Sequence, residues 1–268
     1  MTVAILGVGA MGGAMLAGLL GAGWPADDLR IGEARAERRR ELTDQYGVAA
    51  SGAIQAARGA EVVVLVVKPQ DIPGLLDDIA PVLAPGALIV SLAAGVGLAT
   101  IEAHLPSGWP VVRVMPNTPA LVGAAMSVIA PGSAASADDI ALATKLMAGV
   151  GQVLVMPEKQ LDAVTAVSGS GPAYVMYVAE AMIDAGVLLG LARPVATELV
   201  QQTLFGSAKL LAESGQHPTV LKETVTSPGG TTAAALRTFE DRGVKAGFIA
   251  AMEAAYRRSI EMGQPSGR

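Results

Sequence analysis

The sequence contains no cysteine and only two histidines, His104 and His217. Disulfide bonds, catalytic thiolates and cysteine-based metal sites are therefore excluded, and two histidines are too few for a typical transition-metal centre. The net charge is −5, the opposite of the basic balance expected of a nucleic-acid-binding protein. We therefore expect no metal site and no nucleic-acid partner.

Charged side chains are absent from two long stretches, residues 1–26 and 79–101. The first stretch has no basic start and contains many glycines, and Pro81 and Pro85 interrupt the second. A signal peptide or a membrane span is the alternative interpretation, but buried strands with their turns fit the glycines and prolines better. We expect a cytoplasmic protein with no membrane segment.

The first part of the chain, residues 1–158, alternates short apolar runs with helical stretches. Residues 62–67 form an unbroken run of valine and leucine, which is typical of a strand buried on both faces of a parallel sheet. The alternation predicts an α/β domain of the doubly wound Rossmann type, which binds NAD(P). The predicted strands are 2–6, 29–31, 61–67, 87–92, 111–115, 126–130 and 152–155, and the predicted helices are 10–21, 35–46 and 136–147.

The second part, residues 159–268, has long helical stretches and no strand pattern. Pro172 and Pro194 lie at predicted helix starts, where a first turn tolerates proline. We predict an all-helical second domain, which a chain of 268 residues has room for. Its predicted helices are 172–189, 194–214, 219–224, 231–241 and 245–262.

A glycine-rich turn joins the first predicted strand to the first helix and reads Gly7-Val8-Gly9-Ala10-Met11-Gly12. The spacing fits the dinucleotide fingerprint, in which the first glycine permits a tight turn and the second lets the backbone approach the pyrophosphate. The third glycine allows the helix to pack closely on the strand. A plain tight turn in a glycine-rich chain is the alternative. We predict that all six residues line a coenzyme site.

The end of the second predicted strand bears on whether the coenzyme is NADH or NADPH. Glu33 lies about 20 residues after the third glycine, where a carboxylate accepts a hydrogen bond from the ribose 2′-hydroxyl of NADH. Arg35 follows, with three more arginines at 38–40, and one of them could meet the 2′-phosphate of NADPH. A solvated basic helix face explains these arginines equally well, so the choice stays open.

Three further predicted strands end in turns that should face the coenzyme, because ligands of such sheets bind beyond the carboxyl ends of the strands. The turns are Val67-Lys68-Pro69, Ala93-Ala94-Gly95 and Met115-Pro116-Asn117-Thr118-Pro119. Lys68 is either a charge in the cleft or a helix-end cation. Asn117 is either a turn former or an oriented amide near the nicotinamide.

Two segments rich in hydroxyls and glycines precede predicted helices, Ser168-Gly169-Ser170-Gly171-Pro172 and Thr226-Ser227-Pro228-Gly229-Gly230-Thr231-Thr232. Free backbone N–H groups and the positive end of a helix dipole can hold a small anion there. A helix cap is the alternative for both, made by Thr231 or Thr232 in the second segment. We favour an anion site at 227–232, because two adjacent glycines and a serine exceed what a cap needs.

These motifs together resemble the pyrroline-5-carboxylate reductase family, in the family's order and from end to end of the chain. The most specific segment runs from His217-Pro218 through Thr232, with Leu236 and Glu240 downstream. The resemblance implies reduction of 1-pyrroline-5-carboxylate, a small imino acid, to L-proline by NADPH or NADH, the last step of proline synthesis. It also implies a homodimer with intertwined C-terminal helices, and a higher homo-oligomer such as a decamer is an open alternative.

By motif match, Ser227 and the backbone of Gly229, Gly230 and Thr231 would hold the substrate carboxylate. Thr232 would hydrogen-bond to the ring nitrogen. One position departs from the family pattern, because many members carry Asn, Ser or Arg just after the second strand, where this chain has Glu33 and Ala34. The departure puts the family's usual preference for NADPH in question.

The residue inventory suits this reaction on its own terms. A protonated cyclic imine is already electrophilic, so its reduction needs orientation and a carboxylate anchor more than a positioned acid. A related dehydrogenase that acts on a β-hydroxy acid or on another cyclic imine is one rival. It would want a catalytic lysine on the first long helix of the second domain, and residues 172–189 contain none, which counts against the hydroxy-acid version. A dinucleotide sensor without catalysis is the other rival, and it would leave the 227–232 loop without a ligand.

Overall fold

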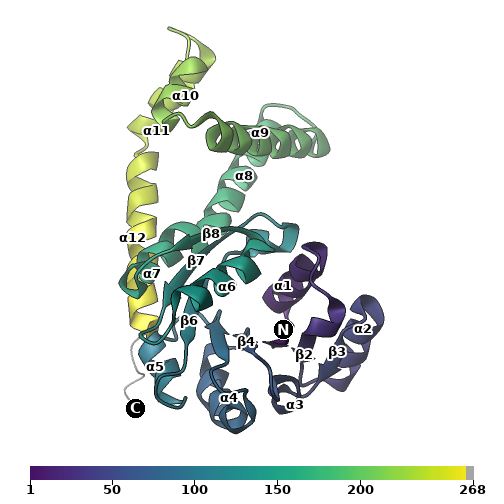
Figure 1. Ribbon diagram of the computed structural model, residues 1–268. Coiled ribbons are helices and arrows are strands. Elements are labelled where there is room, and N and C mark those ends of the chain that lie inside the picture. Colours follow the sequence, from purple (N-terminus) through teal and green to yellow (C-terminus); the bar gives the residue numbers. More distant parts are fainter. Residues whose placement is uncertain (264–268) are drawn as a thin grey trace. The chain divides into compact units, whose positions relative to one another are not determined.

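One mixed sheet organises the first part of the chain in the computed structural model, which describes residues 1–263 (Figure 1). In this range the strand order is β3-β2-β1-β4-β5-β6-β7-β8. Neighbouring strands pair in parallel, except for the antiparallel pair β6 and β7. The strands are β1 (Val3–Leu6), β2 (Leu29–Gly32), β3 (Ala49–Ser51), β4 (Val62–Leu65), β5 (Leu88–Ser91), β6 (Val111–Met115), β7 (Ala125–Pro131) and β8 (Gly151–Val155).

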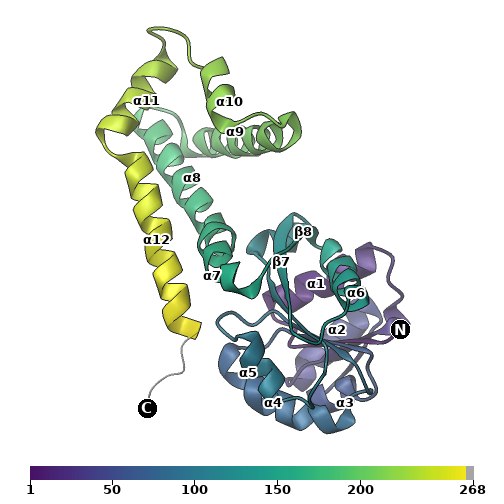
Figure 2. The same ribbon diagram turned by 60° about the vertical axis from the view of Figure 1, so that its left-hand side comes forward.

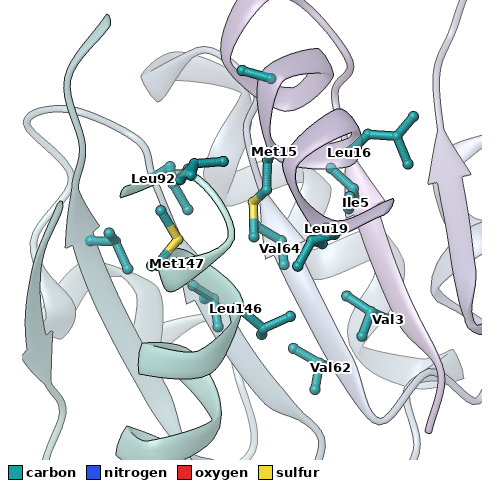
Figure 3. Packing of buried hydrophobic residues seen from close by; sticks show 14 of the residues in the cluster. Val3, Ile5, Met15, Leu16, Leu19, Val62, Val64, Leu92, Leu146 and Met147 are labelled. Carbon is teal, nitrogen blue, oxygen red and sulfur yellow. The ribbon is translucent and has the colours of Figure 1, made fainter. Parts of the chain in front are cut away.

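Helices cover both faces of this sheet, and the alternation of side chains along each strand explains why. On β1, Val3 and Ile5 enter one core, whereas Ala4 and Leu6 enter the other. The first core also holds residues of α1, α2 and α6, as Figure 3 shows for α1 and α6, and the second holds residues of α3, α4 and α5. The helices are α1 (Ala10–Gly21), α2 (Ala36–Tyr46), α3 (Ala53–Ala57), α4 (Ile72–Ile79), α5 (Leu98–Ala103), α6 (Ala137–Ala148) and α7 (Leu161–Val164).

The strands and helices predicted for residues 1–158 are confirmed, with ends within two residues of those expected. Sequence periodicity did not predict β3, α3, α4, α5 or α7. The strand β3 is a short run of alanine and serine, and α4 carries a proline and a glycine in its first turn. The helices α3, α5 and α7 are each shorter than two turns, too short to display a period of 3.6 residues.

The antiparallel pairing of β6 and β7 follows from the short connection between them. The chain turns back after Met115 through the 3-10 turn Thr118–Val122 and re-enters the sheet at Ala125. A parallel pairing would need a crossover of a dozen or more residues, which this segment does not have. The sheet therefore changes strand direction at this point.

Helices joined by loops, with no strand, make up the described residues after Ser170 (Figure 2). They are α8 (Gly171–Leu188), α9 (Arg193–Ser214), α10 (Pro218–Thr224), α11 (Thr231–Asp241) and α12 (Val244–Gly263), and all five predicted helices are confirmed. Helices α8 and α9 pack closely, since a Cβ atom on Gly186 would lie 3.0 Å from the Cβ of Ala196. Among residues 1–263, none of the helices is both long and apolar enough to cross a membrane.

The described chain divides into two compact units. The first unit comprises Met1–Ser170 with the chain from Ala255 onward, and the second comprises Gly171–Ala254. The end of α12 joins the first unit, where the Ser259 hydroxyl donates a hydrogen bond to Asp162 at 2.6 Å. The predicted domain division between residues 158 and 159 lies before α7 and stays a prediction. The predicted second domain runs to residue 268, and residues 264–268 lie outside the described part.

Candidate coenzyme and substrate sites

The predicted fingerprint turn follows β1 and starts α1. Gly7 has a φ of +93°, and its N–H donates to the carbonyl of Gly32 at 2.8 Å. A Cβ atom on Gly7 would lie 2.8 Å from the carbonyl oxygen of Val66, and one on Gly12 would collide with the carbonyl oxygen of Gly7. The first and third glycines are therefore required by close backbone contacts, as the fingerprint predicts.

The start of α1 is suited to a phosphate group. Gly9 and Ala10 are exposed, and no atom lies within 4 Å of where a Cβ of Gly9 would be. The helix has no side-chain cap and no acidic residue in its first turn. Its N–H groups and dipole are thus left for an anion, and a dinucleotide pyrophosphate fits this cradle. Val8 is buried and Met11 is half-buried, so the predicted contact of Val8 with a coenzyme would have to come from its backbone.

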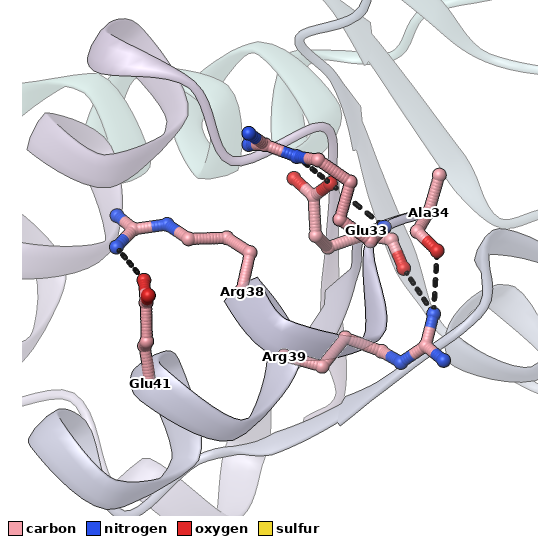
Figure 4. Close-up of polar contacts among 6 residues, drawn as sticks. Glu33, Ala34, Arg38, Arg39 and Glu41 are labelled. Carbon is pink, nitrogen blue, oxygen red and sulfur yellow. Dashed lines mark hydrogen bonds and ion pairs between the residues drawn. The ribbon is translucent and has the colours of Figure 1, made fainter.

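Glu33 lies directly after β2, and its carboxylate is held against the fingerprint turn. Only 8% of the residue is exposed. The backbone N–H and the Nε of Arg35 both donate to its Oε1 at 3.1 Å (Figure 4). Burial raises the pKa of Glu33, but the two hydrogen bonds and the charge of Arg35, together with a hydrogen bond from the backbone of Val8, outweigh it and lower the pKa. The carboxylate is therefore ionised at neutral pH.

The arginines after Glu33 already have partners within the first unit. The Nη1 of Arg39 donates to the carbonyl oxygens of Glu33 and Ala34, at 2.8 and 2.9 Å. Arg38 forms an ion pair with Glu41 at 2.8 Å (Figure 4). The sequence left two interpretations of these arginines open, as phosphate ligands or as a solvated helix face. The structure adds a third role, because Arg39 holds the backbone that carries Glu33.

The other predicted coenzyme turns lie at the same edge of the sheet. The neighbours β2, β1, β4 and β5 are parallel, so the residues after each of them lie at one edge. These residues are Val67, Lys68 and Pro69 after β4 and Ala93, Ala94 and Gly95 after β5. Lys68 is exposed and precedes the 3-10 turn Pro69–Asp71. It does not end a helix, so the helix-end interpretation does not hold, and the charge in the cleft stays a prediction.

Asn117 is tied into the first unit by both atoms of its amide. Its Oδ1 accepts a hydrogen bond from the N–H of Met126 at 2.9 Å. Its Nδ2 donates to the carbonyl oxygen and to the hydroxyl of Ser168, at 3.2 and 3.3 Å. Asn117 therefore joins the start of β7 to the π-helical turn Thr165–Gly169, a contact that the sequence did not predict. Its role beside the nicotinamide stays a prediction.

The predicted anion loop in the second unit is a tight turn at the start of α11. Gly229 has a φ of +69°, and the N–H of Gly230 donates to the carbonyl of Ser227 at 3.0 Å. Pro228 followed by a glycine of positive φ is typical of a type II turn. Ser227 and Thr231 are exposed, and Thr232 is half-buried.

The alternative that Thr231 or Thr232 caps this helix does not hold. The N-cap residue of α11 is Gly230, which makes no side-chain hydrogen bond, and the first turn carries no acidic residue. The N–H groups at the start of α11 therefore have no capping side chain. His217 has a structural role instead, because its Nδ1 accepts a hydrogen bond from the N–H of Thr219 at the start of α10.

Metal chemistry has no support in the described residues. In residues 1–263, no group of three or more His, Asp or Glu side chains is placed to hold a metal ion.

The two sets of predicted site residues lie in different units. The glycine turn with Glu33, Lys68 and Asn117 belongs to the first unit, and the Ser227–Thr232 loop belongs to the second.

Comparison with known proteins assigns the chain to a family. A family model described as pyrroline-5-carboxylate reductase dimerisation matches residues 158–262, and one described as NADP oxidoreductase coenzyme F420-dependent matches residues 2–95. The chain is 43% identical over 282 residues to the pyrroline-5-carboxylate reductase of Mycobacterium leprae, covering 97% of this chain and 96% of that protein. The chain belongs to the pyrroline-5-carboxylate reductase family.

Solved structures of this family have the same fold along the whole chain. The pyrroline-5-carboxylate reductase of Coxiella burnetii is 32% identical with a TM-score of 0.94, covering 98% of this chain and 99% of that one. The enzyme of Plasmodium falciparum, solved with NADP bound, is 31% identical with a TM-score of 0.88, covering 98% of both chains. The resemblance drawn from the motifs is confirmed, as is the combination of a Rossmann-type domain with a helical dimerisation domain.

Proposed function

We infer that the chain reduces 1-pyrroline-5-carboxylate to L-proline by hydride transfer from NADH or NADPH, the final step of proline biosynthesis. The observation that carries this conclusion is the likeness to pyrroline-5-carboxylate reductases over nearly the full length of both chains. The glycine turn supports it independently. Its first and third glycines are fixed by backbone contacts, and the space beside the second is open for a ligand.

The residues around the glycine turn would hold the coenzyme. The N–H groups at the start of α1 would bind the pyrophosphate. The turns Val67-Lys68-Pro69 and Ala93-Ala94-Gly95 lie beyond the carboxyl ends of β4 and β5, where ligands of doubly wound sheets bind. When bound, the coenzyme supplies the hydride. The chain's own contribution is to position the reactants and to exclude water from them.

The Ser227–Thr232 loop would hold the substrate. The Ser227 hydroxyl and the backbone N–H groups of Gly229, Gly230 and Thr231 would bind the carboxylate, which the dipole of α11 favours because no acidic side chain opposes it. The Thr232 hydroxyl would contact the ring nitrogen. A protonated imine needs no further acid, since hydride addition leaves a neutral amine, so hydroxyls and amides suffice for orientation.

The second unit supports a homo-oligomer, and we propose a homodimer. The family model for dimerisation matches residues 158–262, and large apolar side chains stand exposed across this region. Among them are Met176, Tyr177, Leu188, Leu189 and Phe205, each more than 60% exposed. Apolar surface of this extent marks an interface. A larger homo-oligomer, such as a decamer, is the alternative that a measured mass would distinguish.

A direct assay tests the proposed reaction. Purified protein should consume NADH or NADPH, followed by absorbance, only when 1-pyrroline-5-carboxylate is added, and L-proline should accumulate in equal amount. Thr232→Ala should lower kcat while the melting temperature stays that of the parent protein. Ser227→Ala should mainly raise the KM for the imine. Absence of turnover with both coenzymes would contradict the proposed reaction.

A further inference from the structure

The position of Glu33 relative to the glycine turn bears on which coenzyme this chain selects. β1 and β2 pair in parallel with Leu6 opposite Gly32, so the residues that follow these two strands are neighbours. The backbone of Val8, inside the glycine turn, is one of the causes that lower the pKa of the Glu33 carboxylate. A carboxylate in this place lies where the adenosine ribose of a bound dinucleotide presents its 2′ position.

The Glu33 carboxylate is a fixed charge with room for one more donor. Two hydrogen bonds come from Arg35, and both go to Oε1. The two oxygens of a carboxylate offer about four acceptor positions. A ribose 2′-hydroxyl can donate to one of the positions that remain. A 2′-phosphate is largely doubly ionised at neutral pH, so it has little capacity to donate a hydrogen bond. Its negative charge would also lie in contact with the Glu33 carboxylate.

Three of the four arginines that could offset a 2′-phosphate are already engaged. Arg35 pairs with Glu33, and turning it toward a phosphate would leave a buried carboxylate without its ion pair. Arg39 is held by two backbone carbonyls, and Arg38 is paired with Glu41. Arg40 is exposed on α2, so it is the remaining arginine to test.

We propose that Glu33 makes this chain selective for NADH over NADPH, by accepting a hydrogen bond from the 2′-hydroxyl and repelling the 2′-phosphate. The proposal deepens the inferred reductase function and rests on it only for the identity of the site. It reverses the preference for NADPH that the family resemblance implies. The carboxylate selects, and Arg35 and Arg39 position it.

Binding to the unmodified protein is the first test and needs no turnover. Titration calorimetry should give a Kd for NADH that is lower than that for NADPH by about tenfold or more, the size expected of one unfavourable charge contact. As fragments, AMP should compete with NADH better than 2′,5′-ADP does. Equal or tighter binding of NADPH, or no binding of either coenzyme, would overturn the proposal.

Charge removal at Glu33 is the second test. In Glu33→Gln the NADH-to-NADPH ratio of affinities, and of kcat/KM, should fall several-fold toward unity, mainly through tighter NADPH binding. Glu37→Gln is the matched control, because it removes the same charge from an exposed position four residues away. An unchanged ratio in Glu33→Gln, or an equal change in the control, would contradict the proposal. If Glu33→Gln does not fold, the measurements on the unmodified protein decide.

The variant Arg40→Ala separates the two interpretations of the arginines after Glu33, a phosphate ligand or a solvated helix face. Arg40→Ala should leave the ratio of affinities unchanged, whereas a loss of NADPH binding alone would assign Arg40 to a 2′-phosphate and overturn the selectivity for NADH. Binding and turnover measured together also distinguish failure of this proposal from failure of the inferred reaction. Selective NADH binding without imine reduction would contradict the reaction, and imine reduction that prefers NADPH would contradict only the role of Glu33.

Discussion

The two units of this chain treat their apolar side chains in opposite ways. In the first unit the sheet separates two cores, and strand residues such as Val62, Val63 and Val64 are completely buried. Between Gly171 and Ala254 the buried hydrophobic side chains are Ala196 and Val200, both on α9. In both units, the strands and helices that the sequence predicts are present. The difference teaches that regular helices alone do not bury an apolar surface, and that the second unit needs a partner surface to do so.

A charge placed on the exposed apolar surface of the second unit should have the largest effect. Met176 on α8 is 67% exposed and lines an apolar groove with Tyr177 and Leu204. In Met176→Asp, a carboxylate at the proposed interface would be desolvated without a partner, which costs about 3–5 kcal/mol. We expect light scattering to give a monomer mass. Gln202→Asp adds the same charge at a polar exposed position and should leave the mass unchanged.

A contrary result would remove the contrast between the two units. A Met176→Asp protein with unchanged mass and unchanged melting temperature would mean that this surface stays exposed to water. The groove would then need another explanation, and the homodimer would have to form through other residues.

Shortening a core side chain in the first unit should come next in size. Leu16 on α1 is completely buried among Met15 and Leu19 in Figure 3. Leu16→Ala should lower the free energy of unfolding by about 2–5 kcal/mol through lost burial and a residual cavity, while the oligomer mass stays that of the parent. Leu121→Ala, at a position 60% exposed in the same unit, should change stability by less than about 0.5 kcal/mol. Denaturant titration measures both variants.

A variant of Asn117 tests the hydrogen bonds that hold the chain near Ser170, where the first segment of this unit ends. Asn117→Ala removes the hydrogen bonds with Met126 and Ser168. We therefore expect the free energy of unfolding to fall by about 1–3 kcal/mol and amide exchange at Thr165–Gly169 to become faster. If the amide also orients the nicotinamide, kcat should fall further than the loss of folded protein explains. A kcat that follows only the folded fraction would assign Asn117 to positioning alone.

The same contrast explains what the sequence could predict. The unbroken run of valine and leucine at Val62–Leu65, and the long helical stretches after Ser170 with prolines near their starts, are strong local signals, so their ends were predicted closely. The glycine turn was predictable because its glycine spacing is a recognised fingerprint, and the contact that requires Gly12, with the carbonyl oxygen of Gly7, lies within the turn itself. The clamp of Asn117 on Ser168 was not predictable, because it joins residues far apart in the chain. Gly230 as the cap of α11 was also missed, since local composition favours the adjacent threonines.

The smallest expected effect concerns the charge on Glu33. Its pKa in the folded protein lies below the ordinary value of 4.5, so its contribution to stability is present above that value and lost as the pH falls through the folded pKa. The difference in unfolding free energy between the parent protein and Glu33→Gln should be constant at about pH 6 to 8 and below about 1 kcal/mol, because burial opposes the gain from Arg35. It should shrink under acid conditions. A difference that grows with acid would mean that burial outweighs Arg35 and that the carboxylate takes up a proton more readily in the folded protein, which would weaken the case for a fixed charge beside the ribose.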